Sequence, residues 1–399
     1  MEVGASYKHT DAGVIPVDWE VKLLNQLVLL TNGEAHENYI KENGKYIVAN
    51  SKFISSGGKV KKYSDYCLAP AEYRSVLMVM SDVPNGKAIA KCFLVDKDNY
   101  YTVNQRVCSL KARADIPEFL FYAIDRNKYF LAFDDGAQQT NLRKDDILKC
   151  LVAVPPTLRE QSAIAAALSD ADALINSLEK LIAKKRNIKK GAMQLLLTGK
   201  KRLPGFSGEW ETKRIGDIFS IKVGKSLSRY IFNEGSYIVV DMGSVSTEGK
   251  LLLTKTTDFK GDFLDSGDLV MPKDDIGGGN IIGKIAYIDA NNRYVLGDHV
   301  YAMKRKQGYS RFFSYLINSY HTNMSFRKKV AGSVQLGLSR KSVEEQEVYF
   351  PCIEEQTTIA QVLSDIDAEI EALEKKLSKY RLIKQGMMQE LLTGKKRLI

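Results

Sequence analysis

The chain has 399 residues, of which 44% are hydrophobic and 27% are charged. That length is enough for two ordinary domains and too great for one compact core, and the composition excludes a largely disordered chain. The formal net charge of +10 favours a polyanionic partner, because Lys and Arg gain free energy when counterions leave a nucleic acid.

The N-terminus and the cysteines indicate the compartment. The first 13 residues contain no apolar run, so we expect no signal peptide. No stretch of about 18 apolar residues occurs, so we expect no membrane-spanning helix and a cytoplasmic location. Five scattered cysteines without a C-x-x-C spacing argue against a disulfide framework or a zinc site: Cys67, Cys92, Cys108, Cys150 and Cys352.

The first globular half is expected to span residues 1–156. Trp19 lies at its entry, and an aromatic-rich amphipathic helix is predicted over residues 119–133. Short apolar runs predict strands at residues 45–50, 76–80 and 87–95. The half closes at Pro155–Pro156, where a proline disfavours helix in the residue before it.

A long helix is predicted in the next segment, residues 157–203. Its apolar residues step by four and three, which is the spacing of a coiled-coil seam. The seam positions are Ile164, Leu168, Ile175 and Leu178. We expect the helix to end near Thr198–Gly199, because glycine readily takes the left-handed conformation of a helix cap.

The second globular half, residues 204–352, weakly repeats the first. Trp210 at its entry matches Trp19, and residues 332–351 at its exit parallel residues 136–155. Strands are predicted at residues 237–242, 268–272 and 281–288, and one amphipathic helix at residues 311–326. The two halves are therefore expected to share one α+β architecture.

A second long helix, within residues 353–399, repeats the first closely. Residues 160–203 and 355–398 are identical at 28 of 44 positions, with a constant separation of 195 residues. The second seam consists of Ile359, Leu363, Ile366, Ile370 and Leu373. The shared positions include polar ones such as Asp172 and Asp367. Two interpretations remain open, a recent duplication or two copies that dock the same partner surface.

This repeat predicts a fold and a spacing. Tandem copies usually pack around a pseudo-twofold axis, as a homodimer does. The expected fold is α+β, with two pseudo-symmetric globular α/β domains separated by a long antiparallel two-helix coiled coil. About 40 helical residues at 1.5 Å each give a spacer near 60 Å, which approaches two turns of B-DNA. Because the halves differ in sequence, we expect a bipartite and asymmetric DNA target.

The exit segments hold the first group of candidate base contacts. Gln and Asn can pair bidentately with adenine, and Arg with guanine. The candidates are Gln138, Gln139, Asn141 and Arg143 in the first half, and Gln335, Ser339 and Arg340 in the second. The alternative is that these residues occupy solvated turns or contact phosphates.

Two basic loops hold the second group. Lys225, Ser226 and Arg229 follow a glycine in the second half, and Lys59 and Lys61 follow a glycine pair in the first. The residues of the second half are further candidates for base contacts. The loop that holds Lys59 and Lys61 suits phosphate contacts, which position a protein on DNA without specifying a sequence.

Catalytic motifs are missing from the sequence. The Asn/Asp-Pro-Pro-Tyr/Phe loop of an adenine methyltransferase does not occur. Gly278 to Lys284 mimics a phosphate-binding loop, but Ile285 follows where Ser or Thr is needed and a strand is predicted where a helix must begin. The four histidines lack metal-ligand spacing. We therefore expect no catalytic residues, no metal site and no cofactor.

These residues and motifs resemble the specificity subunit of type I restriction-modification systems over nearly the whole chain. The resemblance rests on Pro-x-x-x-x-Glu-Gln at Pro155 to Gln161 and its form shortened by one residue at Pro351 to Gln356. It also rests on the I-A-x-x-L-S-D-x-D that follows each, on LLTGKKRL at both helix ends and on the Trp-containing entry to the second half.

The resemblance implies a subunit without catalysis of its own. In that family two target-recognition domains read the halves of a split DNA sequence, and the repeated helices form an antiparallel coiled coil. The coiled coil sets the spacer and docks two modification (methyltransferase) subunits. Restriction subunits join for ATP-dependent cleavage. The implied partners are double-stranded DNA, the modification subunits and restriction subunits.

Two other classes of function are compatible with parts of the sequence. A coiled-coil scaffold with two protein-binding end domains would show the same helices. A self-contained restriction or modification enzyme would need the motifs that are missing. Binding to DNA of random sequence together with a methyltransferase partner distinguishes the first class from a specificity subunit.

Overall fold

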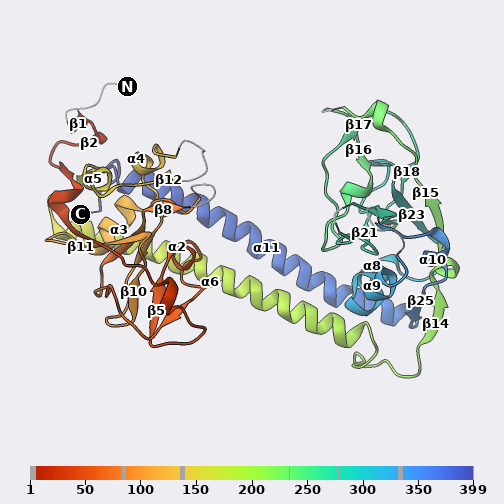
Figure 1. Cartoon of the computed structure of the whole chain (residues 1–399). Coiled ribbons are helices and arrows are strands. Elements are labelled where there is room, and N and C mark those ends of the chain that lie inside the picture. Colours follow the sequence, from red (N-terminus) through yellow and green to blue (C-terminus); the bar gives the residue numbers. More distant parts are fainter. Residues whose placement is uncertain are drawn as a thin grey trace. The chain divides into compact units, whose positions relative to one another are not determined.

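The chain divides into two compact units. In this computed structural model, which describes residues 6–82, 87–134, 140–232, 234–276, 278–330 and 336–398, unit 1 is Met1–Leu178 with Lys376–Ile399. Unit 2 is Glu179–Lys375. The long helices α6 (Leu158–Leu196) and α11 (Ile353–Leu391) each begin in one unit and end in the other (Figure 1). Each unit therefore contains part of both helices.

Unit 1 mixes short strands and short helices. Its strands are β1 (Tyr7–Thr10), β2 (Gly13–Pro16), β3 (Glu20–Leu23), β4 (Val28–Asn32), β5 (Tyr46–Ala49), β6 (Tyr63–Ser64), β7 (Val76–Val79), β8 (Ser81–Asp82), β9 (Cys92–Leu94), β10 (Tyr101–Val103), β11 (Val107–Ala112), β12 (Thr140–Asn141) and β13 (Leu151–Val154). Its short helices are α1 (Leu24–Leu27), α2 (Ser51–Ser55), α3 (Pro117–Ile124), α4 (Lys128–Leu131) and α5 (Lys144–Leu148), with a 3-10 turn at Glu37–Tyr39.

A four-stranded antiparallel sheet in the order β4-β11-β7-β9 organises unit 1. All four side chains of β7 are buried, because each face of the strand meets a different core. Val76 and Met78 pack into the larger core with α3 and α5, whereas Leu77 and Val79 pack into a second core with α2. The second core also covers the sheet β10-β5-β6, in which β5 and β10 are parallel.

Unit 2 contains a similar set of elements. Its strands are β14 (Glu211–Arg214), β15 (Phe219–Val223), β16 (Tyr237–Val240), β17 (Thr256–Thr257), β18 (Phe263–Leu264), β19 (Leu269–Pro272), β20 (Asp274–Asp275), β21 (Ala286–Tyr287), β22 (Tyr294–Leu296), β23 (Val300–Arg305), β24 (Leu336–Gly337) and β25 (Glu347–Phe350). Its short helices are α7 (Ile215–Ile218), α8 (Ser310–Asn318), α9 (Tyr320–Arg327) and α10 (Arg340–Glu344), with 3-10 turns at Ser228–Tyr230 and Met242–Ser244.

The sheets of unit 2 repeat the topology of unit 1. The order β15-β23-β19-β21 corresponds to β4-β11-β7-β9, and the parallel pair β16–β22 corresponds to β5–β10. The small sheets β24-β20 and β25-β14 likewise correspond to β12-β8 and β13-β3. Both halves are therefore mixed α/β domains of similar topology, in agreement with the internal repeat of the sequence, and unit 2 has the additional strand β18 beside β22.

The ends of the long helices complete the larger core of each unit. In unit 1, Ile164 and Leu168 from the start of α6 share this core with Leu391 from the end of α11. In unit 2, Ile359 and Leu363 from the start of α11 share it with Leu196 from the end of α6. Both helices end two residues before the predicted threonines, and Gly199 and Gly394 have φ values of +67° and +68°. The glycines thus take the left-handed conformation expected after a helix.

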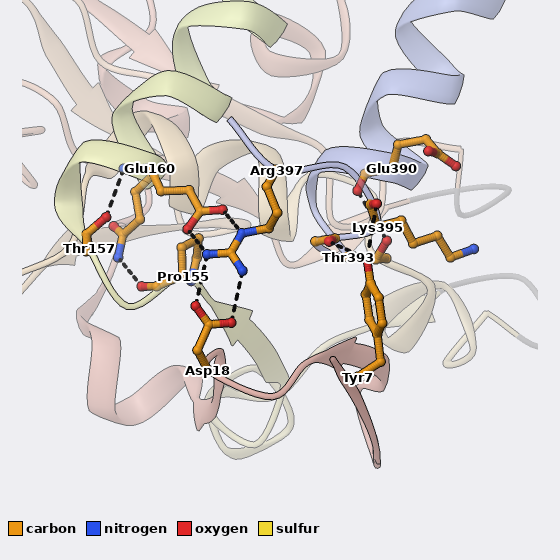
Figure 2. A network of polar contacts seen from close by, with 11 residues as sticks. Tyr7, Asp18, Pro155, Thr157, Glu160, Glu390, Thr393, Lys395 and Arg397 are labelled. Atoms are coloured by element: carbon orange, nitrogen blue, oxygen red, sulfur yellow. Dashed lines mark hydrogen bonds and ion pairs between the residues drawn. The ribbon is translucent and has the colours of Figure 1, made fainter. Parts of the chain in front are cut away.

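A buried ion pair joins the two helix ends in each unit. In unit 1, Arg397 donates hydrogen bonds to the buried carboxylate of Glu160 and to Asp18, at 2.9 and 3.0 Å in the second case (Figure 2). In unit 2, Arg202 donates to the fully buried Glu355 over 2.5 and 2.6 Å. These bonds fix the segment after one helix against the start of the other.

The aromatic-rich segments correct the expectation of one helix in each half. Residues 119–133 divide between α3 and α4, and residues 311–326 divide between α8 and α9. In the first case Arg126 has a φ of +53°, which no α-helix accommodates, and the Asn127 side chain caps α4 by accepting from Tyr129 N. In the second case the backbone of Ser319 is extended.

Two predicted strands are shorter than expected. Of residues 87–95 only Cys92–Leu94 form a strand, because the backbone turns at Ala90, which has a φ of +55°. Of residues 281–288 only Ala286–Tyr287 form one. Within the described part of the chain, no helix is long and apolar enough to cross a membrane.

Candidate nucleic-acid interface

The exit segment of each half pairs with a short strand of its own domain. Asn141 is exposed on β12, opposite Ser81 of β8, and Arg143 is exposed two residues later. In unit 2, β24 pairs with β20, so that Leu336 lies opposite Asp275. Three of the predicted base contacts, Gln138, Gln139 and Gln335, lie outside the described residues.

Two exit-segment candidates of the second half have structural partners. The hydroxyl of Ser339 caps α10 by accepting from Ser342 N over 3.0 Å. Arg340 donates to Glu344 one turn along the same helix, over 2.7 Å. Both side chains are exposed, and their role as base contacts stays a prediction.

The basic-loop candidates are exposed in both halves. Lys225, Ser226 and Arg229 follow β15, and the Ser226 hydroxyl lies 3.3 Å from that of Ser228. Lys59 and Lys61 follow α2. Their positions suit phosphate contacts, which require only exposed cationic or hydroxyl groups.

Beside each exit strand, an aspartate holds a loop that the sequence analysis did not single out. Asp82 of β8 accepts a hydrogen bond from Ala88 N over 2.7 Å. Asp275 of β20 accepts from Ile281 N over 2.9 Å. Each carboxylate therefore accepts from an amide six residues further along the chain, and we call the described residues inside these intervals, Lys87 in the first half and Ile276 with residues 278–280 in the second, the anchored loops.

An arginine from the helical segment also holds each anchored loop. Arg126 donates to the carbonyl oxygens of Lys87 and Ile89, both over 3.1 Å. Arg327 of α9 donates to the carbonyl oxygen of Gly279 over 2.8 Å. The signal in the sequence was an aspartate at matching places in the two halves, which is too weak to identify without the strand pairing.

A cavity of about 710 Å³ in unit 2 lies next to the second anchored loop. Five cationic side chains and no carboxylate line it, and the cations are Arg186, Lys189, Lys190, Lys284 and Arg327. Burial, and then the charge of Arg327, lowers the pKa of Lys284. Glu374 pairs with Arg186, and Asp367 pairs with Lys189, both over 2.6 Å. The surplus positive charge makes this cavity attractive to an anion such as a phosphate.

The two acidic residues of β20, Asp274 and Asp275, accept hydrogen bonds from their own domain. Asp274 accepts from His299 Nδ1 over 2.7 Å, and Asp275 holds its anchored loop. Among the described residues, no cluster of three or more His, Cys, Asp or Glu side chains could hold a metal ion. Lys284 lies in a turn that leads to β21, so the glycine-rich segment before it does not open a helix.

Most of the predicted seam residues of α6 and α11 are buried. Ile164, Leu168, Ile175 and Leu178 are buried on α6, and Ile359, Leu363 and Ile370 are buried on α11. Ile366 and Leu373 are partly buried. In unit 2 the helices run antiparallel, and Lys185 pairs with Glu369 over 2.5 Å.

Some polar positions shared by the two helices have internal partners. Asp172 accepts from Tyr122 and Lys384 over 3.0 and 2.6 Å in unit 1. In unit 2, Asp367 accepts from Tyr315 and Lys189 over 2.9 and 2.6 Å. Other shared positions stay exposed, namely Asp170 with Asp365 and Lys180 with Lys375. These internal bonds give the first pair of aspartates partners within each unit.

Comparison with known proteins gives the same assignment for both halves. The model of a family described as type I restriction modification DNA specificity domain matches residues 16–190 and 207–379. The chain is similar to the type I restriction enzyme MjaVIII specificity subunit of Methanocaldococcus jannaschii, with 24% identity over 96% of this chain and 94% of that protein. The putative MjaX specificity subunit of the same organism is 25% identical over 98% and 97%.

Solved structures share the fold. The S subunit of a type I restriction-modification system from M. genitalium matches with a TM-score of 0.65 and 19% identity, over 94% of this chain and 96% of that one. A chain from a study of complex assembly and conformational transition of the type I system matches with a TM-score of 0.54 and 14% identity, over 95% and 99%.

Proposed function

The chain belongs to the family of type I restriction-modification DNA specificity domains, and we propose that it is a non-catalytic subunit that chooses the DNA sequence for a methyltransferase. The observation that carries this proposal is the double match of the family model to two domains of similar topology. The missing methyltransferase and nucleotide-binding motifs support the absence of catalysis.

In this proposal the two globular halves are target-recognition domains, at residues 1–156 and 204–352. Each reads one half of a bipartite, asymmetric site in double-stranded DNA. Similar topology with different exposed residues supports two readers with different preferences. The positive charge near the second anchored loop supports phosphate contacts beside the bases.

We further propose that α6 and α11 pair as an antiparallel coiled coil that sets the spacer. The buried seam and the antiparallel ion pairs in unit 2 support this arrangement. Each helix has 39 residues, which corresponds to about 58 Å at 1.5 Å per residue. That length suits half-sites separated by base pairs that neither domain reads.

Two modification subunits are the proposed protein partners, and restriction subunits would join them for cleavage. The exposed positions shared by α6 and α11, such as Lys180 and Lys375, form the same surface twice. A repeated surface suits two copies of one partner. The proposal includes no cofactor and a cytoplasmic location.

A binding experiment distinguishes this function from a scaffold with two protein-binding ends. The chain is mixed with its modification subunit and with DNA of random sequence, and retained DNA is measured in a gel shift. We expect DNA affinity beyond that of the modification subunit alone, together with selection of a split motif. Equal affinity with and without the chain would exclude a DNA-specificity subunit.

The spacer proposal has its own test. Seven residues, one heptad, are inserted after Leu181 in α6 and after Lys376 in α11, which are equivalent positions of the repeat. The insertion keeps the seam in register and adds about 10 Å of helix. Methylated sites are then mapped in a host that carries the complex. We expect the same half-sites at a larger separation, and an unchanged separation would refute the spacer role.

A further inference from the structure

The two halves differ in charge at one equivalent position near their long helices. In unit 1 this position is Asp125, whose carboxylate accepts a hydrogen bond from Cys92 N over 2.8 Å. In unit 2 it is Asn318, whose side-chain oxygen accepts from Ile285 N over 2.9 Å and whose amide donates to the Ile285 carbonyl oxygen over 2.7 Å. Asp125 and Asn318 are 193 residues apart, as are Cys92 and Ile285. The same bond is therefore made by a charged residue in one half and by a neutral one in the other.

Asp125 lies near three cations. Burial raises the pKa of its carboxyl group, and the positive charges of Lys384, Lys91 and Arg126 oppose the rise. Lys384 belongs to α11, Lys91 precedes β9, and Arg126 is the next residue in the chain. Unit 1 thus places an internal carboxylate among these cations, and the opposite charges offset one another.

Unit 2 keeps two of these cations at the equivalent positions. Lys284 follows Lys91 by the same 193 residues, and Lys189 corresponds to Lys384 in the repeat of the long helices. Both lysines and Asn318 line the cavity of about 710 Å³. Because Asn318 is neutral, the lysines of unit 2 lack the negative charge that their counterparts have in unit 1.

Three of the five cations of this cavity have no carboxylate partner. Arg186 and Lys189 each form an ion pair over 2.6 Å. Among the residues that the structure describes, no carboxylate forms an ion pair with the other three, which are Lys190, Lys284 and Arg327. These three side chains give the cavity its surplus positive charge.

Carboxylates line an adjoining cavity. It has a volume of about 1270 Å³ and shares four of the cations, but Arg327 does not line it. Its carboxylates include Glu248, which accepts from the Thr247 hydroxyl over 2.9 Å, and Glu371, which pairs with Lys375 over 2.7 Å. The surplus charge is therefore concentrated on the side of Arg327.

Lys284 and Arg327 repel each other. Lys284 is half-buried, and its pKa is lowered by burial and then by the charge of Arg327, against the opposing charge of Glu248. An anion between two like charges in a partly buried site removes their repulsion. The exposed Tyr320 also lines the cavity, and its hydroxyl can donate to an oxygen of such an anion.

We propose that this cavity binds a phosphate group, which supplies in unit 2 the negative charge that Asp125 supplies in unit 1. Lys190, Lys284 and Arg327 bind its oxygens, because lysine and arginine form strong charge-assisted hydrogen bonds with phosphate. The group belongs either to the DNA backbone or to a small phosphate-bearing molecule, for which a cavity of about 710 Å³ has room. The inference goes beyond the proposed function, because the chain alone binds the group whether or not it selects a DNA sequence.

Equilibrium dialysis of the full chain against radiolabelled inorganic phosphate at low salt tests this site. We expect saturable binding of a single phosphate by each chain. Asn318→Asp should weaken this binding by about 10- to 100-fold, because the new carboxylate competes with the anion for the lysines. Unit 1 shows that an aspartate at this position makes the same bond to the backbone. Lys284→Gln should weaken binding by a similar factor, since it removes a charged donor.

Lys304→Gln is the matched control. It lowers the net charge by one, as Asn318→Asp and Lys284→Gln do, but Lys304 pairs with Asp265 over 2.8 Å outside the cavity. We expect it to leave phosphate binding nearly unchanged. Lys190→Gln alters an exposed residue of α6 and should also weaken phosphate binding, which covers the case in which Asn318→Asp or Lys284→Gln does not fold.

A DNA duplex of random sequence distinguishes the two sources of the phosphate group. The chain with its modification subunit is loaded with labelled phosphate, and the duplex is then added. Release of the label would assign the cavity to a phosphate of the DNA backbone. Retention of the label would assign it to a separate phosphate-bearing molecule. Either result agrees with a phosphate site.

Two outcomes would overturn the inference. One is the absence of saturable phosphate binding in the unmodified chain. The other is equal binding by the unmodified chain, Asn318→Asp and Lys190→Gln, which would place the phosphate outside this cavity. Failure of the proposed function is a separate result, because it is measured by selection of a split motif and not by phosphate binding.

Discussion

The hydroxyl of Tyr315 donates a hydrogen bond to the carboxylate of Asp367 over 2.9 Å. The bond joins α8 of the globular part of unit 2 to the long helix α11. Lys189 of α6 binds the other oxygen of the same carboxylate and lies over the Tyr315 ring at 5.3 Å. One aspartate therefore connects the domain with both long helices, and Tyr122, Asp172 and Lys384 repeat the arrangement in unit 1.

We expect Tyr315→Phe to weaken unit 2 in a pH-dependent way. Burial, together with the charge of Asp367, raises the pKa of Tyr315 from 10 to about 12. Between pH 10 and pH 12, Tyr315 keeps its proton in the folded protein but loses it in the unfolded chain. Its contribution to the free energy of unfolding is therefore fully present below pH 10 and falls as the pH rises above that value. At neutral pH the free energy of unfolding should be about 1–2 kcal/mol lower in the variant than in the unmodified protein. That difference from the unmodified protein should shrink by about 1 kcal/mol between pH 8 and pH 11.

Urea unfolding at a series of pH values measures this difference. Tyr320→Phe is the control, because Tyr320 is 73% exposed and its replacement should change the free energy of unfolding little. A constant difference between unmodified protein and Tyr315→Phe from pH 8 to pH 11 would contradict the prediction.

Thiol labelling should report the opening of unit 1 alone. Cys92, Cys108 and Cys150 are buried in this unit, and burial raises the pKa of each, to about 12 for the last two. Cys352 in unit 2 is exposed. A disulfide reagent at pH 8 should react first with Cys352 and next with the half-buried Cys67 of unit 1, and the three buried thiols should react only when denaturant opens unit 1. Cys352→Ser should remove the fastest phase. Fast labelling of the buried three in the native protein would refute this expectation.

Removal of Arg397 should destabilise unit 1 strongly. Glu160 has a side chain only 4% exposed, and Arg397→Met leaves its carboxylate buried without its cationic partner. The loss of one partner from a buried ion pair lowers the free energy of unfolding by about 3–5 kcal/mol. The double variant Arg397→Met, Glu160→Met should recover most of that stability. Asp18→Asn is the control, since Asp18 is 47% exposed and its pair with Arg397 should contribute less than about 1 kcal/mol.

The labelling of the buried thiols in urea provides the measurement. An equal shift of the urea midpoint of unit 1 unfolding in Arg397→Met and Asp18→Asn is the contrary outcome. In that case the buried carboxylate of Glu160 is not the cause of the lost stability.

Lys284→Gln should lower DNA affinity without changing sequence preference. The variant removes one cation from the cavity beside the second anchored loop. If Lys284 neutralises one phosphate, the slope of log affinity against log salt should fall by about 0.9. Lys304→Gln is the control, because Lys304 is paired with Asp265 over 2.8 Å outside this cavity. Equal slopes for Lys284→Gln and unmodified protein would show that Lys284 neutralises no phosphate of the DNA.

The long helices could be predicted from the sequence to within a few residues. Their apolar period persists over 39 residues, and the repeat aligns Leu158 with Ile353 at the two starts. A period of that length predicts a helix even where single residues depart from the pattern. The similar sheet order of the two halves, by contrast, depends on pairings between strands far apart in the chain, such as β4 with β11.

The candidate site was less predictable. Ser339 and Arg340 are predicted base contacts from their residue types, and the structure shows in addition that both form hydrogen bonds at α10, which the sequence did not predict. The break at Arg126 and the closure by Asp82 depend on contacts with segments many residues away, and local propensity contains no information about them. The anchored loops can be identified only from the strand pairing, which places Asp82 and Asp275 at equivalent positions of the two domains.

The division of each unit between distant parts of the chain has a consequence for synthesis. Unit 2 is a continuous stretch, Glu179–Lys375, and can close as soon as the ribosome has released it. Unit 1 must wait for Leu391 and Arg397, which follow its first stretch by about 200 residues. At about 5–20 residues per second this delay is roughly 10–40 s. During that interval the core around Ile164 and Leu168 is open, which makes the nascent first half the part of the chain that most needs a chaperone.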